Sequence, residues 1–480
     1  MASRARVGVR ALTLFVLPLL CASALCEVAG AQQPPAPGEV ELLRREIEEL
    51  KAQQRKYQER IDALSEKVES LTTDAQAQPQ GPSQAQPAAP MPAPTGSAQP
   101  SPATGVDARL LDISMNVLTA VGGSTVDGED LESLDAGAHD PNNNGFTLQQ
   151  AELSLTGAVD PYLRGEVHIV ATSDDIELEE AFATTTALPA GLQLEAGYFL
   201  TEFGIINPRH AHAWDWMDQP FVLTRLMGDE ALRSPGARLG WLTPLPWYSE
   251  LNLGVQNADE GDLTASFIGN GALGRPSVDR DINGPEDLLW LLRWVNSFDP
   301  GRETTLVWGL SGLYGPNDTS NSADTWIYGT DVKIRWRPRS NFRGWPFVLW
   351  QTEILGRSYD AAASSEPDGP TLPSDTLEDY GGYTQVLWGF RPGWATGLRY
   401  EYGSASGDST IDDALVSHDD DPLRDKRHRV SPLLIWHPTH FSRLRLQYNY
   451  DRAKHLDDDD AHTAWLGLEI LYGQHGAHEY

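Results

Sequence analysis

From about residue 110 to the end of the chain, polar and apolar side chains alternate with a period of two, the pattern of β-strands that have one wet and one apolar face. In residues 443–451 the polar face consists of Arg443, Arg445, Gln447, Asn449 and Asp451. Leu444, Leu446, Tyr448 and Tyr450 point the other way. Sixteen such segments follow one another, so the sequence predicts an all-β fold of sixteen antiparallel strands.

The connections between these segments alternate in length. Short turns, most of them containing proline, occur at residues 160–161, 188–190, 244–246, 299–301, 338–340, 392–393 and 438–440. Long acidic connections include residues 122–145, 259–286, 359–379 and 404–427. This alternation is typical of a transmembrane β-barrel, with its turns in the periplasm and its loops outside. A secreted β-sandwich or solenoid is the alternative, but it does not require alternating loop lengths.

Tryptophan lies near the predicted short turns, where an interfacial aromatic girdle belongs. The residues are Trp241, Trp247, Trp336, Trp345, Trp388, Trp394 and Trp436. The formal net charge of −32 disfavours nucleic-acid binding, because an acidic chain repels phosphate.

The first 106 residues predict three different segments. Residues 1–31 resemble a secretory signal peptide, with Arg4, Arg6 and Arg10 before the apolar run 11–20 and small residues at the end. Both cysteines lie within this peptide. Residues 39–72 carry a heptad pattern and predict a short α-helical coiled coil in the periplasm, dimeric or trimeric; a single helix packed on another protein is the alternative. Residues 73–106 are rich in Pro, Ala and Gln and predict a disordered linker, and residues 107–480 form the predicted barrel.

No motif of a known catalytic mechanism occurs in the sequence, so we expect no enzyme, no catalytic residue and no cofactor; a hydrolase with an unmarked Ser and His is the alternative. His210 and His212 with Asp215 contain donors for a divalent metal ion, but His-x-His alone is common, and no metal site is predicted. The acidic runs at residues 418–421 and 457–460 contain ligands for Ca²⁺, but a hydrated loop tip is the explanation that the sequence favours.

Four stretches carry a resemblance to a known family. They are residues 179–183 (EEAFA), 192–199 (LQLEAGYF), 201–204 (TEFG) and 207–214 (NPRHAHAW). In these stretches the chain resembles outer-membrane porins of the phosphate-selective porin O and P family. The resemblance covers roughly residues 107–480 and implies sixteen strands, a homotrimer and a third outer loop folded into the lumen. The long loops here are acidic, whereas the outer mouths of that family resemble a basic funnel.

The predicted function is therefore a porin in the outer membrane of a Gram-negative bacterium, which admits small hydrophilic solutes or ions by passive diffusion. The alternative is an outer-membrane anchor that tethers the envelope through its periplasmic coiled coil. The expected partners are outer-membrane lipid and lipopolysaccharide, the barrel-assembly machinery and two further copies of the chain.

Inward-facing charged positions are the predicted pore lining, although pairing between neighbouring strands would also place charges there. These residues are Arg164, Glu166, His168, Glu195, Lys333, Arg335, Glu353, Arg399, Glu401, Arg443 and Arg445. The predicted constriction loop contributes His210, His212, Asp215, Asp218 and Arg225.

Overall fold

The computed structural model describes residues 111–473, except residues 135–136, 174, 265, 270–271, 276, 366–370 and 412–413. The chain divides into two units, Met1–Pro102 and Ala103–Tyr480, and the described residues belong to the second. The predicted signal peptide, coiled coil and linker lie outside the described residues and stay predictions. None of the described helices is long and apolar enough to cross a membrane.

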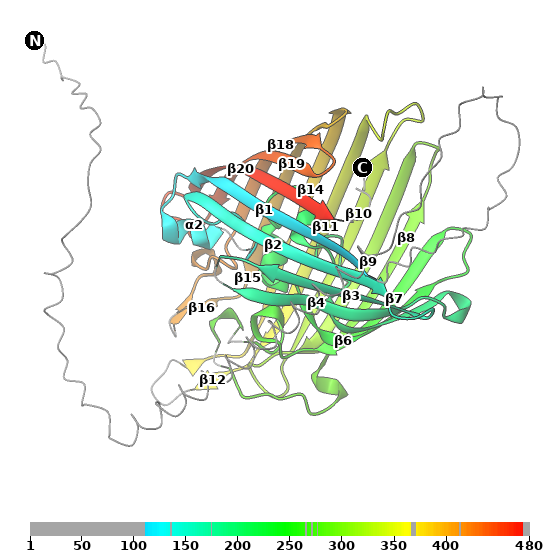
Figure 1. Ribbon diagram of the computed structural model, residues 1–480. Coiled ribbons are helices and arrows are strands. Elements are labelled where there is room, and N and C mark those ends of the chain that lie inside the picture. Colours follow the sequence, from blue (N-terminus) through cyan, green and yellow to red (C-terminus); the bar gives the residue numbers. More distant parts are fainter. Residues whose placement is uncertain are drawn as a thin grey trace, which may run out of the picture. The chain divides into compact units, whose positions relative to one another are not determined.

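Sixteen strands form one closed antiparallel barrel, as the alternation predicted. They are β1 (Asp112–Ser124), β2 (Gly145–Ala158), β3 (Leu163–Ala171), β4 (Ile176–Thr185), β5 (Leu192–Leu200), β6 (Arg233–Leu242), β7 (Tyr248–Asn257), β8 (Leu288–Phe298), β9 (Thr304–Pro316), β10 (Asp324–Trp336), β11 (Phe347–Ala361), β14 (Asp375–Arg391), β15 (Trp394–Ser406), β18 (Arg427–Thr439), β19 (Ser442–Ala453) and β20 (Asp460–Gly473). Each strand pairs with the strand before it in this series, and β20 pairs with β1 from Ser114↔Gly473 to Ser124↔Thr463 (Figure 1). Closure leaves no unpaired sheet edge.

The two faces of the barrel wall follow the predicted alternation. On β19, Arg443, Arg445 and Gln447 are buried, whereas Leu446 and Tyr448 are exposed on the outer face. On β20 the exposed large apolar residues are Leu466, Leu468, Ile470 and Tyr472. Apolar and aromatic side chains therefore cover the outside of the ring, whereas the inward face is polar on β19 and mixed on β20, where Trp465 and Glu469 are both buried.

Most connections alternate between short and long, as predicted, but residues 172–175, 317–323 and 454–459 are short connections in places where the alternation calls for long ones. The long connections contain α2 (Gly128–Leu134), η2 (Ala211–Ala213), α3 (Phe221–Met227), η3 (Gly261–Thr264), η4 (Ala272–Gly274), η5 (Pro285–Asp287), the hairpins β12 (Ser364–Ser365)–β13 (Thr371–Leu372) and β16 (Ser409–Ile411)–β17 (Ala414–Val416), and η6 (His418–Asp420). A short connection holds η1 (Pro189–Gly191). At the ends of the strands joined by short turns, Trp241, Trp247, Trp336, Trp388 and Trp436 are exposed, and Trp345 and Trp394 are half-buried.

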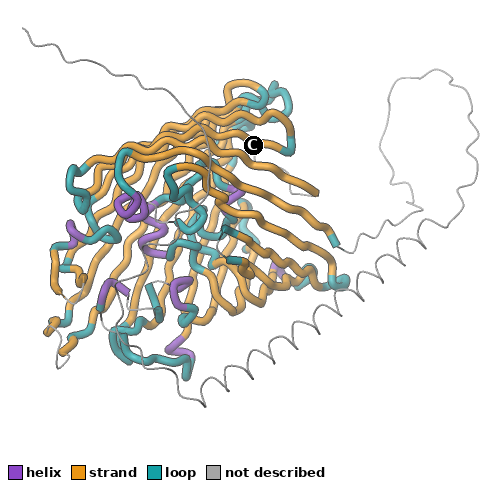
Figure 2. The backbone as a smooth tube through the Cα atoms, turned by 60° about the vertical axis from the view of Figure 1, so that its left-hand side comes forward, coloured by secondary structure: helices purple, strands orange, loops and turns teal. Residues whose placement is uncertain are grey.

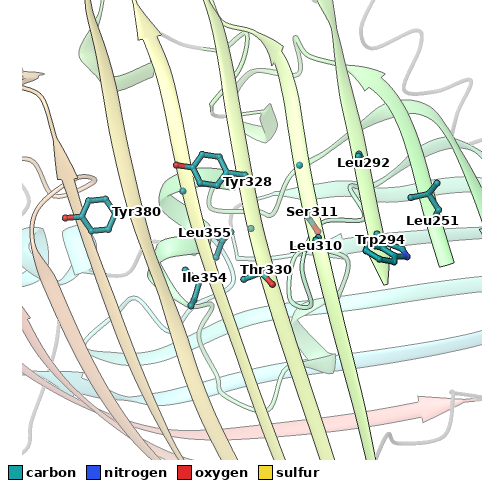
Figure 3. Close-up of a pocket in the computed structure, with 13 residues that line it drawn as sticks. Leu251, Leu292, Trp294, Leu310, Ser311, Tyr328, Thr330, Ile354, Leu355 and Tyr380 are labelled. Atoms are coloured by element: carbon teal, nitrogen blue, oxygen red, sulfur yellow. The ribbon is translucent and has the colours of Figure 1, made fainter. Parts of the chain in front are cut away.

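An apolar groove of about 740 Å³ lies on the outer wall across β7 to β11 and β14 (Figure 3). Leu292, Trp294 and Ile354 line it, and Tyr328 pairs with Gly356 on the neighbouring strand. A Cβ atom on Gly356 would lie 2.8 Å from the Tyr328 ring, so the aromatic ring covers the space that the glycine leaves.

The barrel interior contains an apolar core, which the prediction of a polar lumen did not include. All seven residues of α3 are buried. Leu223 and Leu226 of this helix belong to one apolar cluster with the inward-facing Leu313, Ile327 and Leu355 of the barrel wall. A helix with apolar residues on every side requires apolar partners on several sides, and the wall supplies them. Figure 2 shows helical and loop segments inside the ring of strands.

Candidate functional site

The connection between β5 and β6, residues 201–232, runs through the barrel interior, and we name it the interior segment. The backbone N–H groups of Ile205 and Ile206 donate to Glu353 on β11 over 2.9 and 3.1 Å. Further along, Met217 N–H donates to Gln447 on β19 and Phe221 N–H to Glu401 on β15, both over 2.8 Å. These acceptors belong to different parts of the ring, so the segment crosses the space that the strands enclose.

Two features shape the start of this segment. Gly204 has a φ of +65° and lies so close to the wall that a Cβ atom would be 2.0 Å from Glu353 Oε2. Only glycine adopts this backbone without strain at such a close approach. The amide of Asn207 then donates to the carbonyls of Thr201 and Leu232 over 2.7 and 3.2 Å and accepts from Leu232 N–H over 2.8 Å. These bonds join the two ends of the segment.

One side of the segment meets an arginine wall, which we define as Arg399 (β15), Arg429 (β18), and Arg443 and Arg445 (β19). Asp218, 2 % exposed, pairs with Arg399 and lies 3.1 Å from the Arg429 Nη1 atom. Gln447 and Asn449 also donate to its carboxylate over 2.7 and 2.9 Å. Burial alone would raise the pKa of Asp218, but Arg399 and Arg429 lower it below its usual value. Asp218 is therefore held ionised by four donors from three strands.

The other two arginines of this wall bind the backbone of the segment. Arg443 donates to the carbonyls of Trp214 and His212 over 3.1 and 2.8 Å, and Arg445 donates to those of Trp214 and Trp216 over 3.3 and 3.0 Å. Both side chains are buried. Along with Arg399, Glu353 and Glu401, they were predicted as pore lining, and the structure places all five against the interior segment.

Helix α3 is fixed at its far end through Arg225. This side chain pairs with Asp425 and donates to the carbonyls of Asp425 and Pro422 over 2.8 Å each. The guanidinium groups of Arg225 and Arg427 each lie over the Phe221 ring, 4.8 and 4.7 Å from its centroid. Burial lowers the pKa of Arg225 to about 10, although Asp425 acts against this shift.

The residues just before those at the arginine wall meet a glutamate wall, which we define as Glu152 (β2) with Glu179 and Glu180 (β4). His210 lies between the two glutamates of β4, with Nδ1 2.7 Å from Glu179 and Nε2 2.8 Å from Glu180. His212 Nδ1 lies 2.7 Å from Glu152 Oε2. Burial alone would lower the pKa of His210, but Glu179 and Glu152 raise it well above its usual value.

A β-bulge explains why two neighbouring glutamates point inward. His168 on β3 pairs with Glu180 and the next residue, Ile169, pairs with Leu178, so Glu179 is an extra residue on β4. Both Glu179 and Glu180 are buried, at 3 % and 7 % exposure. Strict alternation places adjacent side chains on opposite faces, whereas a bulge turns both to one face. The sequence analysis therefore missed these glutamates as site residues.

Five predicted residues outside these two walls, Arg164, Glu166, Lys333, Arg335 and Asp215, are more accessible to solvent, whereas Glu195 is buried. Arg164 is the most exposed, with 54 % of its side chain accessible, and lies 3.5 Å from Glu166. Glu195 pairs with Arg238 at 3.0 Å. Lys333, Arg335 and Asp215 are half-buried.

The histidines bring possible metal ligands together. Glu152, His168 and His210 each offer one donor atom, and these three atoms lie within 4.8 Å of one another. The sequence predicted no metal site at His210, His212 and Asp215, and the donors that the structure brings together include His168 and Glu152, which are distant in sequence from His210. The sequence could indicate these two residues through their inward-facing positions on the predicted strands that became β2 and β3.

Comparisons with known proteins give one relative in sequence and several similar solved structures. No protein-family model matches the chain. The outer membrane channel DcaP of Acinetobacter baumannii is 12 % identical, with a TM-score of 0.48 over 76 % of this chain and 97 % of that one. An anion-selective porin from Comamonas acidovorans is 8 % identical, with a TM-score of 0.46 over 75 % of this chain and 99 % of that one. A trimer form of OmpT, an outer membrane protein of Vibrio cholerae, is 9 % identical, with a TM-score of 0.45 over 75 % of this chain and 99 % of that one.

The relative in sequence is an uncharacterized protein of Aquifex aeolicus. It is 30 % identical to this chain over 352 residues, which are 70 % of each protein. On this identity and coverage, the chain belongs to the same family as the Aquifex aeolicus protein.

Proposed function

We propose that the protein is an outer-membrane porin, a channel for passive diffusion of small hydrophilic solutes or ions. The observation that carries this proposal is the closed sixteen-stranded ring with an apolar outer face. A lipid bilayer contains no water to satisfy backbone N–H and C=O groups, and a closed barrel satisfies them within its own ring. The inward-facing polar residues then line a path for water.

The interior segment is the element that narrows this path. It is hydrogen-bonded to β11, β15 and β19 and packs its helix α3 against the wall. Solutes pass beside it, along the more accessible residues Arg164, Glu166, His212, Lys333 and Arg335. Arg399, Glu401 and Glu353 act as supports of the segment, because each of them contacts it.

Conductance across a planar lipid bilayer tests this proposal directly. Purified, folded protein is added at low concentration, and we expect stepwise increases in current of uniform size. Steps that come in threes would support the homotrimer that the resemblance implies. Absence of any step from protein that migrates as a folded, heat-modifiable barrel contradicts the porin function.

An envelope anchor is the second candidate function, and the heptad pattern of residues 39–72 favours it. Deletion of residues 39–71 separates the two functions. A porin keeps its single-channel conductance in this variant, whereas an anchor loses the attachment of the outer membrane to the underlying envelope. Loss of conductance together with intact attachment contradicts both assignments.

A further inference from the structure

We propose that Glu152, His168 and His210 form a binding site for one divalent transition-metal ion of the zinc type inside the barrel. The three residues come from β2, β3 and the interior segment. Glu152 Oε1 lies 3.1 Å from His168 Nδ1 and 3.8 Å from His210 Nδ1. A tetrahedral zinc ion with bonds of 2.0–2.1 Å holds its ligands about 3.3 Å apart. The two distances from Glu152 Oε1 are close to this value, and all three donor atoms lie within 4.8 Å of one another. The chemistry of two imidazoles and one carboxylate suits Zn²⁺ and its neighbours better than Mg²⁺ or Ca²⁺.

A fourth donor lies beside these three. Glu179 Oε2 is 2.7 Å from His210 Nδ1, the nitrogen that faces Glu152. When His210 binds a metal through this nitrogen, it loses the proton there, and Glu179 becomes available to complete four-coordination. The bulge on β4 is what supplies this carboxylate in addition to that of Glu180.

The groups around the ligands hold them in orientation. Glu180 Oε2 lies 2.8 Å from His210 Nε2, and its Oε1 atom accepts from Leu200 N–H over 2.8 Å. A carboxylate on the second nitrogen of a ligating histidine fixes the ring and its tautomer in many metal sites. Asn207, three residues before His210, joins both ends of the interior segment and so limits movement of the histidine backbone.

The carboxylate of Glu152 is held in the same way. Its Oε2 atom accepts from Gln150 over 3.3 Å and lies 2.7 Å from His212 Nδ1. Its Oε1 atom, the one between His168 and His210, also accepts from Ser154 over 2.8 Å. His212 thus supports the site from the far side of Glu152.

The charge of the cluster favours a cation. Four glutamates, Glu152, Glu166, Glu179 and Glu180, contact three histidines within 4 Å. The His168 and His210 rings are 4.4 Å apart between centroids, and the His210 and His212 rings are 5.7 Å apart. Stacked imidazolium rings repel one another, whereas one divalent metal ion offsets two of the four negative charges without that repulsion. The side chains of His168, His210 and His212 are 12 %, 14 % and 32 % exposed, so the cluster is within reach of solvent.

The alternative is a purely structural role, in which these histidines only anchor the interior segment through hydrogen bonds. Metal titration of the folded, untagged full-length protein separates the two roles, and it needs no conductance measurement. Because His475 and His478 offer a further His-x-x-His pair, the parent protein for all titrations is the double variant His475→Gln/His478→Gln. Co²⁺ is the spectroscopic probe, since four-coordinate Co²⁺ absorbs visible light strongly, and Zn²⁺ is then used as its competitor.

We expect the parent to bind one Co²⁺ per chain with intense visible absorption, which one equivalent of Zn²⁺ removes. His168→Gln and Glu152→Gln should each weaken binding at least tenfold. The matched control is His428→Gln, because His428 lies on β18 near Tyr400, away from the cluster, and its loss should leave binding unchanged. Heat-modifiable migration confirms folding of each variant. Absence of saturable one-to-one binding by the parent overturns the proposal whatever the variants do, and so does an equal loss in His168→Gln and His428→Gln.

Discussion

The interior segment is anchored at two walls whose charges are arranged in opposite ways. At the arginine wall the barrel supplies permanent cations and the segment supplies one acid, Asp218. At the glutamate wall the barrel supplies acids and the segment supplies histidines, His210 and His212. Guanidinium keeps its proton at any ordinary pH, whereas imidazole exchanges a proton for a metal ion. The arginine wall is therefore a fixed clamp, whereas the histidines at the glutamate wall can exchange a proton for a metal ion.

Among the substitutions that test the difference between the two walls, Asp218→Asn should have the largest effect on the free energy of unfolding. The substitution leaves Arg399 and Arg429 buried without their shared carboxylate and brings an amide N–H₂ toward the donors Gln447 and Asn449. We expect the free energy of unfolding to fall by about 3 kcal/mol, as when one partner of a buried ion pair is removed. Urea unfolding of the refolded barrel measures it. Asp458→Asn in an exposed loop is the control, with a change within about 0.5 kcal/mol, and an equal effect in both variants would contradict the fixed clamp.

Acid should weaken the ion pair between Asp425 and Arg225, which fixes α3 outside the arginine wall. Burial alone would raise the pKa of Asp425, but His455 at 3.0 Å and Arg225 lower it to about 2. A carboxyl group with a lowered pKa contributes stability that is present above its unfolded pKa and is lost as the pH falls through the folded value. Between pH 4 and pH 2 the wild-type protein should lose about 2 kcal/mol that Asp425→Asn does not lose. If the free energy of unfolding of the wild type and of Asp425→Asn fell in parallel with pH, Asp425 would not be the group that causes the loss of stability.

A smaller effect is expected at the glutamate wall from Glu180→Gln. The amide oxygen still accepts from Leu200 N–H, and Glu179 still holds the other nitrogen of His210, so we expect a loss of about 1 kcal/mol. Urea unfolding measures it, with the outward-facing Glu378→Gln on β14 as control. A loss as large as that of Asp218→Asn would remove the distinction between the two walls.

The smallest effect on stability is expected from Arg164→Gln, which changes an accessible charge that belongs to neither wall. Unfolding should change by less than about 0.5 kcal/mol. If the protein is a porin, loss of this cation raises its preference for cations, and the reversal potential in a KCl gradient shifts accordingly. Lys454→Gln, at an exposed loop beyond β19, should shift the reversal potential less. Equal shifts would place Arg164 away from the conducting path.

The barrel could be predicted from the sequence because its signal is local and repeated. Each strand alternates between lipid-type and polar side chains, and each turn contains its own breaker residues, so the strand number and the antiparallel order follow from the pattern. Arg445 and Leu446 were assigned to the correct faces for this reason.

The candidate site was less predictable because its contacts join distant residues. Asp218 meets Arg399 and Gln447 only after the ring closes, and no period in the sequence relates them. The inward or outward direction of each side chain was predicted from strict alternation, and the bulge at Glu179 breaks that alternation. The apolar interior was also missed, because α3 is only seven residues long and too short for a clear helical period.

The anchoring of the interior segment has a consequence for the order of assembly. The segment follows β5, but the partners of Asp218 and of Trp216 lie on β15, β18 and β19. Loop-closure entropy must be overcome before such distant contacts add stability, so they form late. The segment therefore locks only when the last strands have arrived, and a barrel that stalls short of β18 keeps Asp218 and Trp216 unprotected. Protease sensitivity of this stretch would then report whether a newly made chain has closed its ring.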